Sequence, residues 1–365
     1  MPTPTDTPRS SANRLGLDYR LEVNSMGTPP VAITDVHVHL RDAESVHLYG
    51  QVAQRFGVTK CWTMSPLQQV DMIRDTLGES NVQFIAVPDW NHPDRLHTMG
   101  DGFLDSIRAF EAIGSRIVKF WAAPRARDLA IDVGQPDLMD LNGPIRRRQM
   151  ECAASLGMAI MTHVADPDTW FDTVYTDTDR YGTKEQQYEQ FEQALEEFPV
   201  PWMAAHMGGW PEDLDRLDTL LERYDHLHLD TSATKWMVRT LSTHDQQRVE
   251  QFFTRWQGRL LFGSDIVAVG EHLHAGGDGG RADQSVSAEE AFDLYASRYW
   301  ALRTMFERDW QGESPIADPD LHQCDPERFD PSDAPLLIGR SLSKPVLQSL
   351  YSTAALAFGN SVGMR

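Results

Sequence analysis

The sequence predicts a single α/β domain, a (β/α)8 TIM barrel. From residue 31 onward, eight short apolar runs alternate with stretches of helical spacing, and this alternation is typical of parallel strands joined by helices. The length of 365 residues suits one large barrel. A doubly wound sheet is the alternative fold, but the first run is not followed by the glycine-rich phosphate loop of such folds.

The predicted strands are short runs in which apolar side chains dominate. They cover 31–38, 58–64, 82–87, 116–121, 158–163, 201–206, 226–231 and 259–264. Because the strands of such a barrel run in one direction, their carboxyl ends meet at one face, where barrel enzymes carry their active sites.

Helical patterns follow these strands. The clearest predicted helices are 44–57, 144–157, 212–224, 287–309 and 344–358. Pro144 suits a first helical turn, and Gly157 suits a helix end. Ser287 and Glu290 have the spacing of a capping box, and the last helix is expected to close the barrel.

The remaining segments define the expected domain organisation. Residues 1–30 are polar and rich in Pro, Ser and Thr, which predicts a loose tail or a strap before the barrel of residues 31–365. Residues 266–286 form a long loop after the eighth strand, and the Pro- and Asp-rich residues 310–340 form an insertion. The first 30 residues hold no apolar signal or membrane segment, so we expect a cytoplasmic location.

The charge and the cysteines restrict the partners. The chain has 33 Lys and Arg against 54 Asp and Glu, a net charge of −21, which argues against nucleic acid and anionic membranes. Cys61, Cys152 and Cys324 are far apart and match no metal-site spacing. The expected partner is a small-molecule substrate, and the sequence leaves homo-oligomerisation open.

The first predicted strand contains a candidate metal-binding pair. Alternate side chains of a strand share a face, so Asp35, His37, His39 and Arg41 are expected to point one way, and the intervening apolar residues towards the helices. His163, His206 and Asp265 then end the fifth, sixth and eighth strands.

Any one of these residues could be an ordinary polar residue at a strand end, but their recurrence predicts one metal centre. Imidazole and carboxylate donors suit a divalent cation, zinc first, with manganese, iron or cobalt as alternatives.

Other residues near the strand ends are candidate substrate contacts. Six tryptophans are predicted close to the barrel mouth: Trp62, Trp90, Trp121, Trp170, Trp210 and Trp236. They could pack under long loops, or form a flat apolar wall for a ring-shaped substrate, for which we single out Trp62, Trp121 and Trp210. Arg239 is a candidate anion contact.

Four further polar residues receive a structural interpretation. Asp166 and Asp168 are expected to cap the loop or helix after the fifth strand. His272 and His274 are expected at the surface, with a lid or second-metal role as the alternative.

These features resemble the amidohydrolase superfamily. HMGGWPEDLDRL, LHLDTSA and LLFGSD are similar to the strand six, seven and eight regions of its amidohydrolase-2 branch, which includes lactonases and decarboxylases. The resemblance covers roughly residues 31–265. Thr353 stands where the branch usually has asparagine.

The resemblance implies a metal-dependent hydrolase that attacks a C–O or C–N bond of a small, ring-like substrate bearing a carboxylate. A lactone, a cyclic amide or an amide would fit. A non-oxidative decarboxylase of an aromatic or unsaturated acid is the alternative, and a barrel that binds metal or ligand without catalysis is a third.

Lys119 and Arg41 bear on the number of metal ions. Dihydroorotases, in the same superfamily, carry a carboxylated lysine on strand four that bridges two metals, and a His-x-His-x-Arg first strand that His37, His39 and Arg41 match. Lys119 could therefore be a carboxylated bridge, a cation that positions substrate, or a lysine paired with a carboxylate. In that pattern Arg41 binds a substrate carboxylate.

The amidohydrolase-2 resemblance favours one metal, with a second only if Lys119 is carboxylated. The metal would lower the pKa of its bound water to about 7. Asp265 would take the proton of that water and pass it to the leaving group. His206 would be a metal ligand or would orient the substrate carbonyl.

Overall fold

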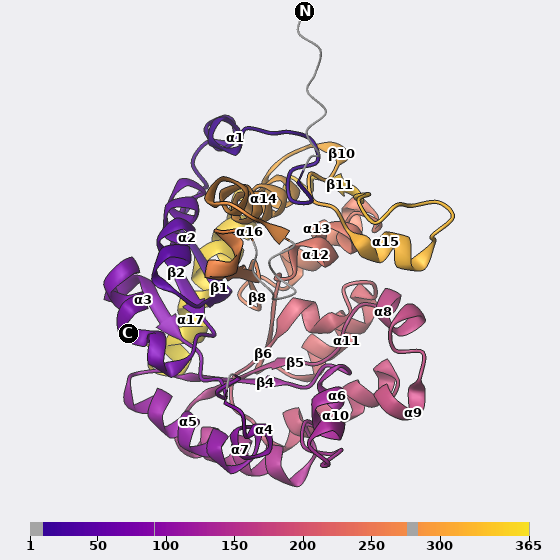
Figure 1. The fold of residues 1–365 in the computed structure, drawn as a ribbon. Helices are drawn as coiled ribbons and strands as arrows, with labels where there is room; N and C mark the ends of the chain where they lie inside the picture. The colour runs from indigo at the N-terminus through magenta and orange to yellow at the C-terminus, as the bar shows by residue number, and fades with distance from the viewer. Residues whose placement is uncertain (1–9, 91, 276–283, 365) are drawn as a thin grey trace, which may run out of the picture.

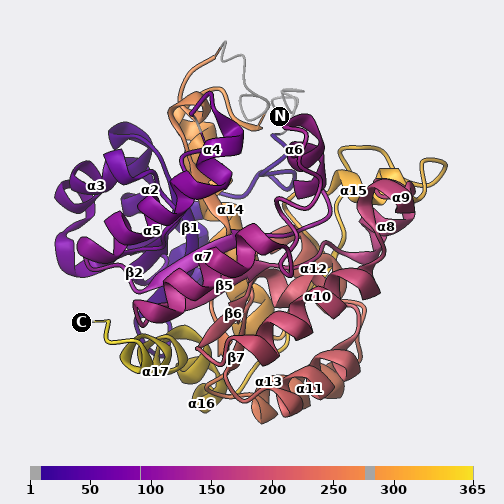
Figure 2. The same cartoon turned by 90° about the horizontal axis from the view of Figure 1, so that it is seen from below.

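The computed structural model describes residues 10–90, 92–275 and 284–364. Figures 1 and 2 show helices arranged around the outside of the central strands. The strands are β1 (Ile33–Leu40), β2 (Val58–Thr63), β3 (Val82–Phe84), β4 (Ile117–Trp121), β5 (Ala159–His163), β6 (Trp202–Ala204), β7 (Leu227–Asp230), β8 (Leu260–Leu261), β9 (Ile266–Ala268), β10 (Gln311–Glu313) and β11 (Leu336–Ile338).

Backbone hydrogen bonds join the first eight strands into a closed parallel barrel. Two parallel sheets have the orders β3-β2-β1-β9 and β4-β5-β6-β7-β8. Ala86, just after β3, forms a parallel bridge to Val118 of β4. At the other seam, the amide of Val36 in β1 donates to the carbonyl of Phe262 after β8, at 2.9 Å. The eight strands lie within the eight predicted runs, except that β1 extends two residues further, and the predicted fold class is confirmed.

The helices follow the strands as the sequence predicts. They are α1 (Tyr19–Met26), α2 (Ala43–Arg55), α3 (Val70–Leu77), α4 (Arg95–Met99), α5 (Asp101–Ala112), α6 (Ala126–Asp132), α7 (Pro144–Ser155), α8 (Asp168–Thr173), α9 (Thr178–Tyr181), α10 (Lys184–Glu197), α11 (Leu214–Arg223), α12 (Thr234–Leu241), α13 (Gln246–Arg255), α14 (Ala288–Glu307), α15 (Pro319–Cys324), α16 (Lys344–Gln348) and α17 (Ala354–Ser361). The last predicted helix is divided by a π-helical turn at Ser349–Thr353. Ser287 caps α14 by accepting from the amide of Glu290.

The predicted tail and loops contain regular elements. The predicted loop 266–286 begins with β9, which pairs with the end of β1 from Val38 to Leu40. The insertion 310–340 holds the antiparallel pair β10–β11 and α15. The amide of Ala317 in this insertion donates to the carbonyl of Ser11 at 2.7 Å, so the N-terminal segment runs beside it. Residues 1–9 and 276–283 of these predicted segments lie outside the described residues.

A bulge in β1 corrects the predicted placement of Asp35. Asp35 pairs with Cys61 and Val38 pairs with Thr63, so β1 holds one residue more than β2 between these pairs. The extra residue reverses the alternation of side chains. Asp35 therefore bonds to Ser264 at 2.5 Å and to Tyr299 of α14 at 2.9 Å, whereas His37 and His39 face the barrel mouth.

The turn after β6 brings the chain close to the end of β5. His206, Met207 and Gly208 all adopt left-handed backbone conformations, with φ of 58°, 50° and 71°. Gly209 follows with φ of 72°, and a Cβ atom there would lie 1.8 Å from the carbonyl oxygen of Ala165. Only glycine allows this approach, which holds His206 against the neighbouring strand. No helix in the described ranges is both long and apolar enough to cross a membrane.

We predict that Gly209→Ala destabilises the fold more than Gly157→Ala. Gly157 also has a left-handed backbone, with φ of 68°, but has open space around the added Cβ. Gly157→Ala should cost about 1–2 kcal/mol from the backbone alone, and Gly209→Ala about 1–3 kcal/mol more from the clash. Urea unfolding measures both free energies, and equal losses would contradict the close approach.

Candidate metal centre

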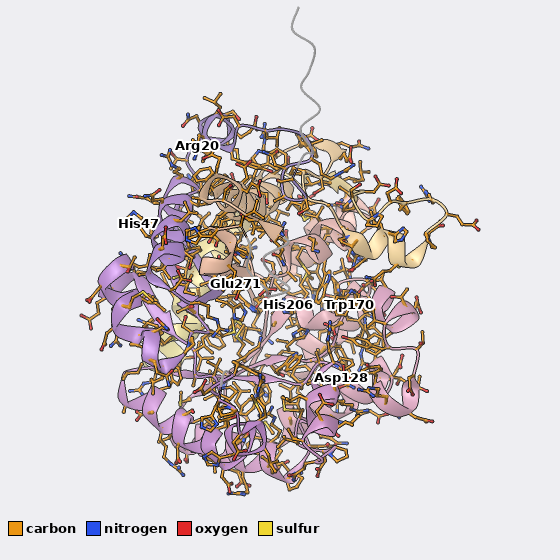
Figure 3. All side chains as sticks on the ribbon, viewed as in Figure 1. Arg20, His47, Asp128, Trp170, His206 and Glu271 are labelled. Atoms are coloured by element: carbon orange, nitrogen blue, oxygen red, sulfur yellow. The ribbon has the colours of Figure 1, made fainter. Side chains whose placement is uncertain are left out.

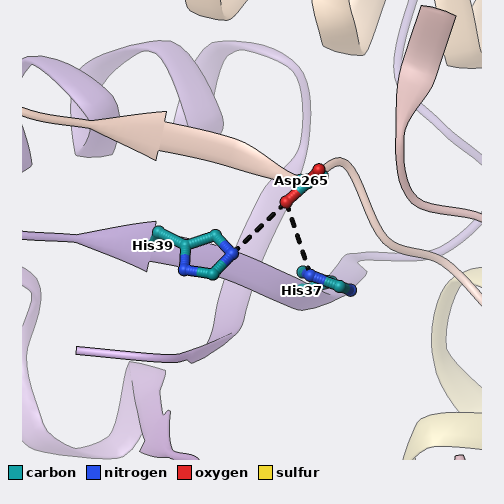
Figure 4. A group of neighbouring side chains, drawn as sticks. All are labelled: His37, His39 and Asp265. Atoms are coloured by element: carbon teal, nitrogen blue, oxygen red, sulfur yellow. Dashed lines mark ion pairs between the residues drawn. The ribbon is translucent and has the colours of Figure 1, made fainter. Parts of the chain in front are cut away.

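His37, His39 and Asp265 meet at the carboxyl end of the barrel. Nε2 of His37 lies 3.4 Å from Oδ1 of Asp265, and Nε2 of His39 lies 3.3 Å from the same oxygen (Figure 4). One ligand atom from each residue lies within 4.8 Å of the other two. Asp265 has φ of 60°, a strained conformation that turns its carboxylate towards the two imidazoles. This group can hold a cation.

His206 and His163 extend the group across the barrel. The ring centroid of His206 lies 4.9 Å from that of His37 and 4.6 Å from that of His163. His37, His206 and Asp230 form a second set whose ligand atoms lie within 4.8 Å of one another. The structure therefore brings all five predicted ligands into one neighbourhood, with His163 outside both sets. In Figure 3, His206 lies near the centre of the barrel.

Asp230, at the end of β7, orients two of the histidines, and the sequence analysis missed it. Its Oδ2 lies 2.9 Å from Nδ1 of His37, and its Oδ1 accepts from the backbone amide of His206 at 2.9 Å. A carboxylate can only accept, so Nδ1 of His37 carries the hydrogen and Nε2 keeps its lone pair for a cation. The sequence signal for this role was that Asp230 lies near the end of a predicted strand, in the stretch LHLDTSA.

Ser232 and Asp166 contact the imidazoles of His206 and His163. The hydroxyl of Ser232 lies 2.7 Å from Nδ1 of His206. Asp166 accepts from Nε2 of His163 at 2.8 Å and from the hydroxyl of Tyr175 at 2.6 Å, so it orients a histidine rather than capping a helix. Asp168 lies in the first turn of α8 but does not cap it, because its carboxylate pairs with Nζ of Lys184 at 2.5 Å.

The electrostatics of the group favour the protonation states that a cation needs. Burial lowers the pKa of His39 to about 4 and holds the pKa of His206 well below its usual value. Burial alone would raise the pKa of Asp265, but the hydrogen bond from His39 and the neighbouring imidazoles hold it well below its usual range. Neutral imidazoles beside an ionised carboxylate are ready-made ligands, and these residues fit a divalent cation.

Lys119, in β4, is a buried cation beside this group. Its Nζ is enclosed and makes no hydrogen bond within the described part of the chain. Burial lowers the pKa of Lys119 to about 8, against the pull of the Asp230 and Asp265 carboxylates. An enclosed amine without a partner is costly, and either a substrate group or carboxylation would supply one.

A cavity of about 910 Å³ opens above these residues. Arg41 and Lys119 line it together with the three residues of Figure 4, His163 and His206. Four of the six predicted tryptophans form apolar parts of its wall: Trp90, Trp121, Trp170 and Trp236. The cavity can take a small-molecule substrate.

Three predicted substrate contacts have other partners. Trp62 is buried and packs against Phe358 of α17, with ring centroids 5.9 Å apart. Trp210 packs against Tyr188 at 4.9 Å. Arg239 forms ion pairs with Asp318 and with Asp320, and so joins α12 to the insertion.

The two histidines of the late loop differ from each other. His272 is buried, contrary to its expected surface position, and its Nδ1 lies 3.1 Å from the hydroxyl of Tyr295. His274 is exposed, as expected, and lies 3.6 Å from Glu44.

No protein-family model and no curated protein matches the chain. Solved structures with a similar chain path include dihydroorotase from Saccharomyces cerevisiae in complex with 5-fluoroorotic acid. It is 10% identical, with 74% of this chain and 84% of that chain covered and a TM-score of 0.43.

A second similar structure is 5-carboxyvanillate decarboxylase from Novosphingobium aromaticivorans, complexed with manganese and 4-hydroxy-3-methoxy-5-nitrobenzoic acid. It is 12% identical, the match covers 92% of this chain and 97% of that chain, and the TM-score is 0.36. Dihydropteroate synthase from Thermus thermophilus is 13% identical, the match covers 64% of this chain and 88% of that chain, and the TM-score is 0.30. Because the identities and TM-scores are this low, the similar structures give no information about the chemistry of the site, which must be inferred from its own residues.

We predict that Asp230→Asn lowers metal affinity about 10- to 100-fold while the fold is kept, because His37 loses its charged partner. Titration with Co²⁺, followed by visible absorption, measures this affinity. Asp225→Asn is the matched control, since Asp225 precedes the same strand and is fully exposed. Equal affinities in the two variants would show that Asp230 does not support the site.

Proposed function

We propose that the chain is a metal-dependent hydrolase of the amidohydrolase superfamily that opens a C–O or C–N bond of a small, ring-like substrate bearing a carboxylate. The observation that carries this proposal is the convergence of His37, His39 and Asp265 in a cavity partly walled by tryptophans. A lactone, a cyclic amide or an amide fits this chemistry.

His37, His39 and Asp265 would hold the cation, with His163 and His206 completing the set. A divalent cation bound there would polarise the carbonyl and lower the pKa of water to about 7. Zinc suits these donors first, and manganese, iron or cobalt are alternatives. We propose one cation, with a second only where Lys119 is carboxylated.

Asp265 would move the proton. Its low pKa keeps it ionised, so it can accept the proton of the attacking water and then deliver it to the leaving oxygen or nitrogen. His206 is kept neutral by burial and would act as a ligand or orient the carbonyl. Arg41 and Lys119 line the same cavity and would bind anionic or carbonyl groups of the substrate.

Non-oxidative decarboxylation is the second candidate. Trp90 and Trp121 lie edge to face with centroids 5.6 Å apart, and both line the cavity. Such walls suit an aromatic acid as well as a lactone. In that reaction Asp265 would first take a proton from water and then deliver it to a ring or alkene carbon before CO₂ leaves.

We predict that Asp265→Asn lowers turnover about 100- to 10,000-fold, because the general base is lost. Steady-state rates measure this on lactones and cyclic amides supplied to the metal-loaded protein. Asp225→Asn again serves as the control and should keep full activity. A near-normal rate in Asp265→Asn would refute the assigned role.

Metal removal tests the same proposal independently. Dialysis against a chelator should abolish hydrolysis, and adding Zn²⁺ or Mn²⁺ should restore it, because the carbonyl is otherwise not polarised. The same preparations are assayed with aromatic acids. Release of CO₂ without any hydrolysis would favour the second candidate over the first.

A further inference from the structure

Two cationic side chains from outside the metal centre line the same cavity. Lys235 lies in the first turn of α12, and Arg298 lies midway along α14. These helices are in contact, and Figure 1 shows them near each other above the barrel. Neither residue belongs to the strand-end ligands, and the sequence analysis did not single out either one.

Neither cation has a carboxylate partner in the described part of the chain. Nη1 of Arg298 is enclosed and makes no hydrogen bond there. Lys235 likewise forms no ion pair among the described residues. The two carboxylates that act on Lys235, Asp318 and Asp320, already pair with Arg239.

For both cations, burial outweighs the attraction of the surrounding carboxylates. Burial lowers the pKa of Lys235, and the nearby guanidinium of Arg298 lowers it further. Burial lowers the pKa of Arg298 to about 10, so this residue stays charged at neutral pH. Two cations facing one cavity repel each other, and an anion between them would relieve this cost.

This pair adjoins the metal centre. Lys235 precedes Trp236, whose ring centroid lies 5.4 Å from that of His206 and 6.2 Å from that of His163. The Asp265 carboxylate is among the charges that act on Arg298. A molecule bound against Trp236 could therefore reach the cation site and the two basic side chains together.

We propose that Lys235 and Arg298 form an anion subsite that binds a carboxylate of the substrate while its scissile bond faces His37, His39 and Asp265. The guanidinium supplies a planar pair of donors, and the ammonium adds a point charge. This inference rests on the proposed function. It implies that the substrate is an acid whose carboxylate lies away from the bond that is cleaved.

Isophthalate, an aromatic dicarboxylate, is the probe, and benzamide is its neutral counterpart. Binding to the metal-loaded full chain is followed by quenching of tryptophan fluorescence, because Trp236 adjoins the pair. Lys235→Met and Arg298→Met should each weaken isophthalate binding about tenfold or more, since each loses a charge-assisted contact. Benzamide binding should change less than twofold.

Lys344→Met and Arg108→Met are the controls, because both positions are exposed on distant helices. Arg298→Lys keeps the charge and should recover part of the affinity, which separates a charge effect from a folding defect. Circular dichroism checks that each variant is folded. Unchanged isophthalate binding in both methionine variants, or a loss confined to Arg41→Met, would overturn the subsite.

The binding readout needs no turnover, so the two proposals can fail separately. A protein that hydrolyses no substrate but loses isophthalate binding in the Lys235 and Arg298 variants would refute the hydrolase and keep the subsite. An active hydrolase whose KM for acidic substrates is unchanged in both variants would refute the subsite alone.

Discussion

The candidate site depends on the buried carboxylate of Asp230. Burial alone would raise its pKa, but the imidazole of His37 and the hydrogen bond between them hold it well below its usual range. Its two oxygens bond to the ring of His37 and to the backbone of the strained turn at His206. One anion at the end of β7 thus fixes an imidazole from β1 and the turn after β6. A buried carboxylate is tolerated only with such partners.

The barrel places the site by joining its two sheets at both seams. Ala86 bridges to β4, and Val36 bonds to the residue after β8, so the strand ends that carry the ligands surround one space. The left-handed conformations of His206 and Asp265 are strained, and the surrounding packing holds them. Gly209 allows the close approach to Ala165 on which the conformation of His206 depends.

Much of this arrangement could be predicted from the pattern of the chain. The alternation of apolar runs and helical spacing gives the barrel, and polar residues at strand ends indicate the ligands. The bulge that turns Asp35 outward could not be predicted from the sequence. The sequence suggests regular alternation of side chains along β1, and only the pairing of β1 with β2 reveals the extra residue. Arg239 pairs with the insertion, while Lys235 and Arg298 reach the cavity through helix packing. Such tertiary contacts cannot be read from local spacing.

The proposed chemistry requires a cation among His37, His39 and Asp265. Anomalous diffraction from crystals of the metal-loaded protein tests it most directly. We expect a metal peak bounded by Nε2 of both histidines and the Asp265 carboxylate, with the Asp230 carboxylate on the far side of His37. A metal bound elsewhere, or no metal peak in a folded and fully loaded protein, would contradict it.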